Sequence, residues 1–165
     1  MKDIKMRTMK KKIYSSALAM VMVLVGCSSD LDKVFYQESL SQPAVFAPLD
    51  SHYELDAQQS DRVAIDFLWS RPQVNYPASF TSDLQMDLAD NQFVDAVTLA
   101  STKTDSTYAI TVSDLNDVLM KLIAVHDLEV GAIPVSFRLV STLSSDVAPL
   151  ISNVVSTTIT PYVSE

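Results

Sequence analysis

Residues 77–90, PASFTSDLQMDLAD, alternate between apolar and polar side chains with a period of two. The apolar set would share one face of a strand: Ala78, Phe80, Leu84, Met86 and Leu88. The polar set would share the other face: Ser79, Thr81, Asp83, Gln85 and Asp87. Successive side chains of a strand point to opposite faces, so this stretch predicts an antiparallel strand with one dry and one solvated face.

The same period recurs on both sides of this stretch. In VAIDFLWS (63–70), one face would carry the large apolar residues Val63, Ile65, Phe67 and Trp69. Further strand candidates lie at residues 96–100, 107–112, 135–141 and 153–160. About seven short strands in about 110 residues predict an all-β fold, an immunoglobulin-like antiparallel β-sandwich.

One segment has the period of a helix instead. In SDLNDVLMKLIA (113–124), apolar residues recur at i, i+3, i+4, i+7 and i+8: Leu115, Val118, Leu119, Leu122 and Ile123. Such a stripe indicates an amphipathic helix. Ser113 is the expected N-cap. We expect one short helix, packed across the open end or an edge of the sandwich.

The first 26 residues differ in kind from the rest of the chain. A basic block of six Lys and Arg residues precedes the apolar run 17–25. Spanning a bilayer takes about 20 apolar residues, so this run is too short for a transmembrane helix. A basic start followed by a short apolar core predicts a secretory signal peptide at 1–26. Met9 is an alternative start to Met1, because it directly precedes three lysines.

The only cysteine of the chain, Cys27, follows this apolar run. The residues before it, Leu24, Val25 and Gly26, resemble the lipobox of bacterial lipoproteins. The resemblance implies that Cys27 is lipidated and becomes the N-terminus of the mature chain. Several acyl chains hold a protein on a membrane, whereas one chain anchors it only marginally. A thioether-linked sulfur has no thiolate, which excludes a nucleophile, a redox thiol and a metal ligand at this position.

Residues 27–48 are polar and contain Pro43 and Pro48, so we expect a flexible acidic tether that leads to a domain at 49–163. Asp30 and Asp32 in this tether resemble a surface-export signal. Without the leader, 139 residues carry 6 basic and 19 acidic side chains, a net charge of −13. A body this acidic repels nucleic acid, which excludes nucleic-acid binding as a function.

Few residues in the predicted domain suggest chemistry. Asp83 and Asp87 share a strand face at a separation of about 13 Å, too far for a glycosidase pair, and a solvated face explains them. We expect no catalytic residues, no cofactor and no metal site; a calcium site on strand-face aspartates is a weaker alternative. Trp69 and Tyr76 are the weak candidates for glycan contact, and core packing is the competing explanation for Trp69.

The order of several motifs resembles the N-terminal domain of the SusE family. The motifs are WS (69–70), LQMDLADNQF (84–93), STYAITVSDLNDVLMKL (106–122), VSFRLVS (135–141) and TPY (160–162). The resemblance covers roughly residues 30–162. It implies an outer-membrane lipoprotein of a starch-utilisation-type system, exposed at the cell surface beside a TonB-dependent glycan transporter and its lid lipoprotein.

In that family, as the resemblance implies, later carbohydrate-binding domains hold starch-like glycan and the N-terminal domain is mainly a spacer. The expected function is therefore that of a non-enzymatic accessory of glycan uptake. Two alternatives stay open at this point. One is a direct glycan-binding module; the other is a structural or adhesin-like lipoprotein unrelated to nutrient uptake.

Overall fold

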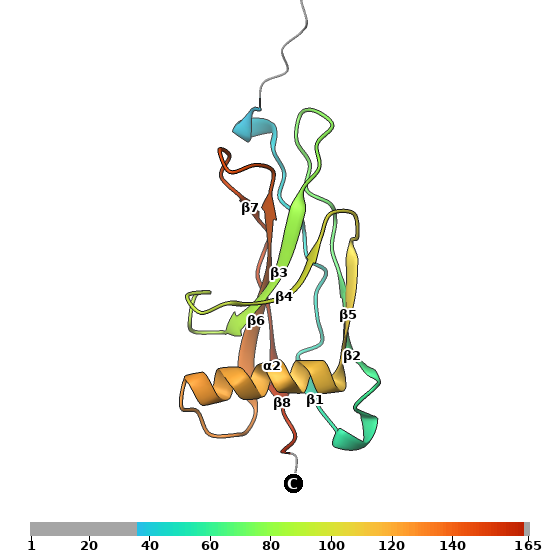
Figure 1. The fold of residues 1–165 in the computed structure, drawn as a ribbon, viewed down its shortest axis with the longest axis vertical. Helices are drawn as coiled ribbons and strands as arrows, with labels where there is room; N and C mark the ends of the chain where they lie inside the picture. Colours follow the sequence, from blue (N-terminus) through green and yellow to red (C-terminus); the bar gives the residue numbers. More distant parts are fainter. Residues whose placement is uncertain (1–35, 164–165) are drawn as a thin grey trace, which may run out of the picture. The chain divides into compact units, whose positions relative to one another are not determined.

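The computed structural model describes residues 36–163, which form two β-sheets and one α-helix (Figure 1). The larger sheet has the strand order β1-β8-β6-β3-β4, with β7 paired to β6, and the smaller sheet pairs β2 with β5. The strands are β1 (His52–Glu54), β2 (Val63–Leu68), β3 (Thr81–Leu88), β4 (Val97–Thr102), β5 (Thr107–Thr111), β6 (Ile133–Thr142), β7 (Leu150–Ile151) and β8 (Val155–Thr160). The helix is α2 (Val112–Val125), and two 3-10 turns are η1 (Glu38–Leu40) and η2 (Ala57–Gln59).

This topology is an all-β sandwich with one helix, as the sequence predicts. Strands β2 and β5 lie in one sheet, whereas β3, β6 and β8 lie side by side in the other. Immunoglobulin-like domains divide their strands in the same way, with B and E in one sheet and C, F and G in the other. The pairing of β1 with β8 is parallel, and every other strand pair is antiparallel. The connection from β5 to β6 changes sheets through α2.

The alternation of apolar and polar residues correctly predicts which side chains of β3 in the larger sheet face the core. On β3, Leu84 and Met86 are fully buried, and Leu88 packs partly buried against the core. The facing residues of β6, Val135, Phe137 and Leu139, are also fully buried. Burying a large apolar side chain contributes about 1.5–3 kcal/mol, so this inner face is the main stabilising surface of the domain.

The prediction for β2 is confirmed at three of its four apolar positions. Ile65, Phe67 and Trp69 are buried in the core, but Val63 is 56% exposed. The pairing of β2 with β5 shifts register between Val63 and Ile65. Because of this irregularity, the Val63 side chain does not follow Ile65 and Phe67 into the core. The prediction that Val63 is buried is wrong.

Helix α2 forms where its stripe predicts it and lies across one end of the sandwich (Figure 1). Leu115, Leu119, Leu122 and Ile123 are buried in the core. The expected cap at Ser113 is wrong, because Thr111 is the N-cap and its hydroxyl accepts a bond from the Asp114 amide at 3.1 Å. Strand β5 runs directly into the helix, so the first turn begins two residues earlier than expected.

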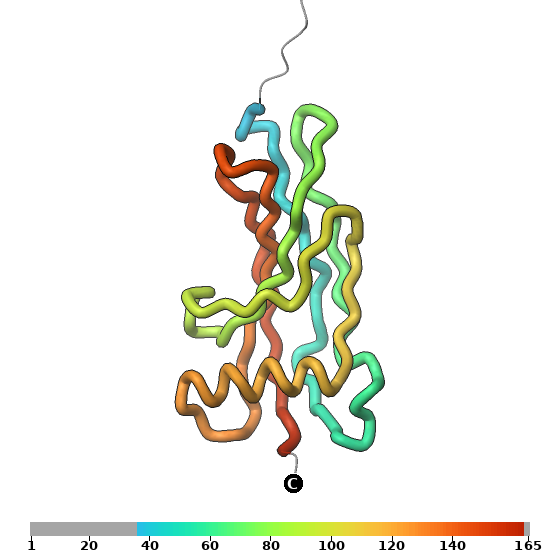
Figure 2. Tube along the Cα trace, in the orientation of Figure 1, coloured from blue at the N-terminus to red at the C-terminus, as the bar shows by residue number. Residues whose placement is uncertain are grey.

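Residues 36–48, which we expected in the flexible tether, belong to the folded unit instead. Ala44 and Phe46 are 1% and 3% exposed, and Gln42 and Phe46 form bridges with Gln73 and Trp69. Figure 2 shows this segment (cyan) running along the length of the sandwich. The prediction failed because the short apolar run 44–47 lies between Pro43 and Pro48, and only two of its residues, Ala44 and Phe46, are buried in the core.

The side chain of Asn153 holds this first segment in place. Its amide oxygen accepts a bond from the Phe46 backbone N at 2.7 Å, and its amide nitrogen donates to the Phe46 backbone O at 3.3 Å. Asn153 lies in the gap between β7 and β8. An amide side chain therefore satisfies the backbone donor and acceptor of Phe46, which the bridge with Trp69 leaves without partners.

Candidate functional site

The residues predicted to carry the anchor lie outside the described part of the chain. They are Leu24, Val25, Gly26 and Cys27, together with the rest of the predicted signal peptide and residues 27–35 of the predicted tether. Within residues 36–163, no helix is both long enough and apolar enough to cross a bilayer. The sites that can be placed are those around Trp69 and on the two sheets.

Trp69 directly follows β2 and continues its inward alternation. The residue is 7% exposed, and the centroid of its ring lies 5.8 Å from that of Phe46. Its backbone N donates to the carbonyl of Ser106 at 3.0 Å, which ties β2 to the turn before β5. A glycan-stacking platform needs an exposed ring face, whereas this ring is part of the hydrophobic core.

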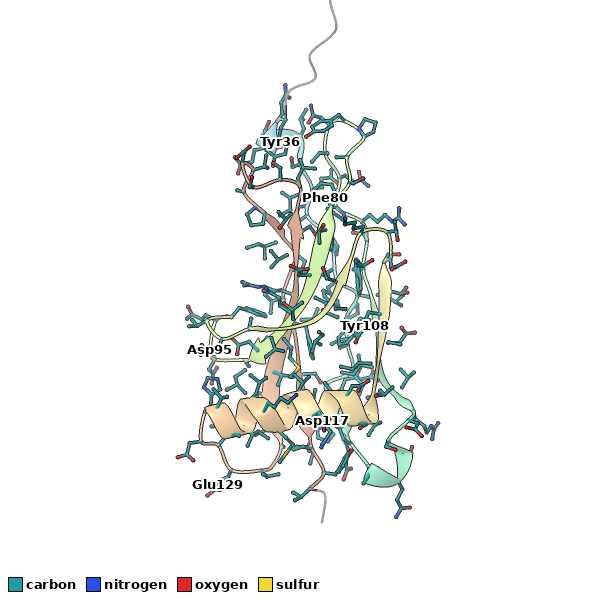
Figure 3. All side chains as sticks on the ribbon, viewed as in Figure 1. Tyr36, Phe80, Asp95, Tyr108, Asp117 and Glu129 are labelled. Carbon is teal, nitrogen blue, oxygen red and sulfur yellow. The ribbon has the colours of Figure 1, made fainter. Side chains whose placement is uncertain are left out.

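Trp69 also lines two adjoining hollows where the start of β3 and the end of β4 meet the start of β5. The hollows have volumes of about 80 and 170 Å³ and share the residues Trp69, Ser82, Thr102 and Asp105. Phe80 lines the smaller hollow and Tyr108 lines the larger one. Figure 3 labels Phe80 near the upper end of β3 and Tyr108 on β5. Ligand pockets for small molecules measure about 300–1,000 Å³, so neither hollow encloses a sugar residue with its neighbours.

The polar groups around these hollows are bonded to one another. The carboxylate of Asp105 accepts from the hydroxyl of Thr102 at 2.8 Å, and Arg71 donates to the carbonyl of Thr104. The buried hydroxyl of Ser82 pairs with that of Ser141 at 2.8 Å. The first two bonds fix the turn between β4 and β5, and the third joins β3 to β6.

The structure does not bring the second candidate, Tyr76, together with Trp69 at these hollows. Tyr76 is half-buried in the connection between β2 and β3, and it lines neither of the two hollows. Its neighbour Asn75 accepts a bond from the backbone N of Gln37 at 3.4 Å. The connection around Tyr76 therefore lies against the first described residues rather than over the end of β4.

The aspartates of β3 have unlike surroundings. Asp83 is half-buried and accepts from the hydroxyl of Ser101 at 2.6 Å. Asp87, expected on a solvated face, is fully buried, which corrects that expectation. Its carboxylate accepts from the Leu88 backbone N at 2.8 Å and from the amide of Asn91 at 3.1 Å. A buried carboxylate needs such partners, since an unpaired charge in the interior is costly.

Asp87 is buried because the loop between β3 and β4 is held against the outer face of the sheet. Gln92 and Phe93 both have positive φ angles, 54° and 62°, a left-handed conformation that costs non-glycine residues about 1–2 kcal/mol each. The guanidinium of Arg138 on β6 lies 4.2 Å from the centre of the Phe93 ring, and its Nε donates to Gln85 at 2.9 Å. A cation–π contact of about 0.5–2 kcal/mol helps to offset the strain.

Three tyrosines pack against the hydrophobic core. Tyr53, Tyr108 and Tyr162 pack partly buried against the core, and the Tyr108 ring stacks on Phe67 at 6.4 Å. The hydroxyl of Tyr53 accepts from the Asp50 backbone N at 3.2 Å. Burial raises the pKa of Tyr53 above its ordinary value, the hydrogen bond from the Asp50 backbone lowers it, and the charge of Asp50 raises it further.

The histidines have separate surroundings. His52 is exposed at the start of β1, whereas Nε2 of His126 lies 3.9 Å from a carboxylate oxygen of Asp95. Figure 3 places Asp95 beside the end of α2. Within residues 36–163, no three His, Cys, Asp or Glu side chains are arranged to hold a metal ion.

Sequence reasoning missed two structural sites. The amide of Asn153 lies inside a segment that was expected to be a regular strand, and no neighbouring residue signals its contact with Phe46. The loop of residues 89–96 contains no local sign of its contact with Arg138. Both contacts join residues more than 40 positions apart, so local patterns do not contain them.

The sequence model of the SusE outer membrane protein family matches residues 29–138. This match spans two thirds of the 165 residues. The chain belongs to the SusE outer membrane protein family. Comparison with curated proteins and with solved structures finds no match.

Membership of the SusE family confirms the resemblance and associates the chain with the outer membrane in a Sus-type system. The matched SusE segment includes Trp69, Tyr76 and the loop that covers Asp87, and it ends within β6. Strand β8 and Tyr162 lie beyond the match, although the expected resemblance extended to about residue 162.

Proposed function

We propose that this chain is a surface-anchored lipoprotein and a non-enzymatic accessory or spacer in a Sus-like glycan-utilisation complex. The observation that carries the proposal is the SusE match, which begins at Ser29, two residues after Cys27. In this proposal residues 1–26 are a lipoprotein signal peptide, Cys27 carries the lipids, and residues 28–35 are a short tether. Its neighbours would be a TonB-dependent glycan transporter and the lid lipoprotein of that transporter.

The spacer role is supported by the surroundings of the two glycan-contact candidates. The ring of Trp69 packs in the core, and the hollows beside it are smaller than ordinary ligand pockets. Residues 36–163 carry sixteen acidic and five basic side chains. An excess of charge of one sign favours solubility, which suits a spacer domain beside the polar surface of a membrane.

Direct glycan binding is the second candidate, and the polar groups of Thr102 and Asp105 beside Trp69 are the place where it would occur. Calorimetry of the purified chain with starch and pullulan compares the two roles, with Trp69→Phe and Tyr76→Ala as variants. The spacer role predicts no heat above dilution for any of the three proteins. Binding heat for the wild type, lost in one variant whose melting temperature is unchanged, would establish a binding module instead.

Anchoring is tested separately by Cys27→Ser. Each buried methylene contributes about 0.8 kcal/mol to membrane attachment, so loss of the acyl chains moves the protein to the soluble fraction. The measurement is the distribution of the protein between membrane and soluble fractions, with labelled fatty acid as a second readout. An equally membrane-bound Cys27→Ser protein, or a wild type without label, rules out the proposed anchor.

A further inference from the structure

The two edge strands of the larger sheet differ in how well they are protected against pairing with another strand. One edge is β1, which has only three residues and includes Glu54. The other edge is β4, whose six residues, Val-Thr-Leu-Ala-Ser-Thr, contain no charge, no proline and no glycine. Natural edge strands are usually kept short or carry Lys or Pro, because unpaired backbone groups invite another strand.

The neighbouring loops leave the outer side of β4 open. The loop before β4 folds back over the sheet, since Phe93 lies on Arg138 of β6, two strands away from the edge. The turn after β4 is held by Thr102 and Asp105 and leads directly to β5 in the other sheet. Within residues 36–163, the only strand that pairs with β4 is β3.

The charged residues before and after β4 have opposite signs, so two antiparallel copies of the strand would place opposite charges next to each other. Asp95, whose carboxylate also accepts from the Asn91 amide at 3.2 Å and lies 3.9 Å from Nε2 of His126, is four residues before Leu99. Lys103 is four residues after Leu99. In an antiparallel pair centred on Leu99 and extended beyond β4 to residues 95–103, residue 95 of one copy faces residue 103 of the other. The pair thus repeats one Asp–Lys contact twice, which fits the self-complementary interface of a two-fold dimer.

We infer that β4 is a self-association edge, at which two copies of this chain pair antiparallel and join their larger sheets. Leu99 is an extra residue in the pairing of β4 with β3, and such a bulge weakens an edge. The net negative charge of the domain also opposes association. The dimer is therefore weak, and it forms where the chains are concentrated, as on a membrane. This inference does not depend on glycan binding.

Disulfide trapping of the full-length chain in membranes and in detergent tests the contact. Directly opposed residues of antiparallel strands lie about 4.5–5.5 Å apart at Cα, within disulfide reach, so Leu99→Cys gives a linked dimer on mild oxidation. Ala109→Cys, at the exposed edge strand β5, is the matched control. The wild type, which carries Cys27, gives the background level of disulfide-linked dimer. Equal dimer from Leu99→Cys and Ala109→Cys, or none from either, overturns the inference.

Charge reversal in the Leu99→Cys chain tests the register. Asp95→Lys and Lys103→Asp each place like charges opposite each other twice, so each lowers the trapped dimer by about ten-fold. The combined Asp95→Lys and Lys103→Asp chain restores the dimer, and Lys121→Asp on α2 leaves it unchanged. Melting curves confirm that each variant folds. A double variant that stays as low as the single ones overturns the proposed pairing.

Discussion

Asp87 and Asp83 share one face of β3, yet only Asp87 is fully buried. Alternation correctly assigns both residues to the outer face of the strand. It contains no information about the loop of residues 89–96, which closes over that face and gives Asp87 the amide of Asn91. At the scale of the residue, burial is thus decided by a loop that the strand pattern does not describe.

Removing the carboxylate in Asp87→Ala leaves the Leu88 N–H and part of the Asn91 amide without an acceptor. Unsatisfied buried donors cost about 1–3 kcal/mol each, so we expect the free energy of unfolding to fall by about 2 kcal/mol. Urea denaturation measures this change. Asp83→Ala on the same face is the control, and it changes stability by less than about 1 kcal/mol. Equal effects of the two substitutions would contradict the burial of Asp87.

Tyr53 makes the stability of the domain depend on alkaline pH. Its folded-state pKa is raised above the unfolded value, chiefly by burial. The folded state therefore holds the phenolic proton more tightly. This contribution to stability is complete below the unfolded pKa of about 10 and is lost as the pH rises through the higher folded pKa. Urea midpoints between pH 8 and pH 11 measure it, and Tyr53→Phe should decline less steeply over this range than the wild type.

At the scale of the element, α2 shows what a periodic pattern can and cannot predict. The apolar stripe locates the helix and its buried face, since Leu115 and Leu119 are fully buried. Its start depends on which hydroxyl reaches an exposed amide of the first turn. Thr111 and Ser113 are both suitable cap residues, and the end of β5 selects Thr111.

Thr111→Ala removes the cap of α2. Loss of an N-cap side chain costs about 0.5–2 kcal/mol, and we expect about 1 kcal/mol here. Ser113→Ala, two residues further on, should change the free energy of unfolding by less than about 0.5 kcal/mol. Chemical denaturation of both variants gives the comparison. A larger loss for Ser113→Ala than for Thr111→Ala would place the cap at Ser113.

At the scale of the whole molecule, the first described segment completes the sandwich. Phe46 contacts Phe67 and Trp69, with ring centroids 5.9 and 5.8 Å away. The segment thus covers the core beside β2, while Asn153 binds its backbone between β7 and β8. The domain therefore begins near Tyr36 rather than at residue 49, and any tether after Cys27 is correspondingly shorter.

Phe46→Ala tests this boundary. Truncating a buried phenylalanine costs about 3–5 kcal/mol, so we expect a loss in that range and a clearly lower melting temperature. Val45→Ala is the matched control, because Val45 is the preceding residue and is 59% exposed. It should change stability by less than about 0.5 kcal/mol. If both variants melt like the wild type, residues 36–48 do not contribute to the core.

The sequence alone determined the β-class, the place of the helix and most of the inward-facing residues, because these depend on periods of two and 3.6 in neighbouring residues. The order of several short motifs in the sequence also indicated the SusE family. The tertiary structure decided the burial of Asp87, the cap at Thr111, the contact of Phe46 with Trp69 and the hydrogen bonds of Asn153 to Phe46. The contacts of Phe46 and Asn153 depend on which distant segments come to lie alongside, and the cap and the loop over Asp87 depend on how β5 and β3 end, which no period of two or 3.6 encodes.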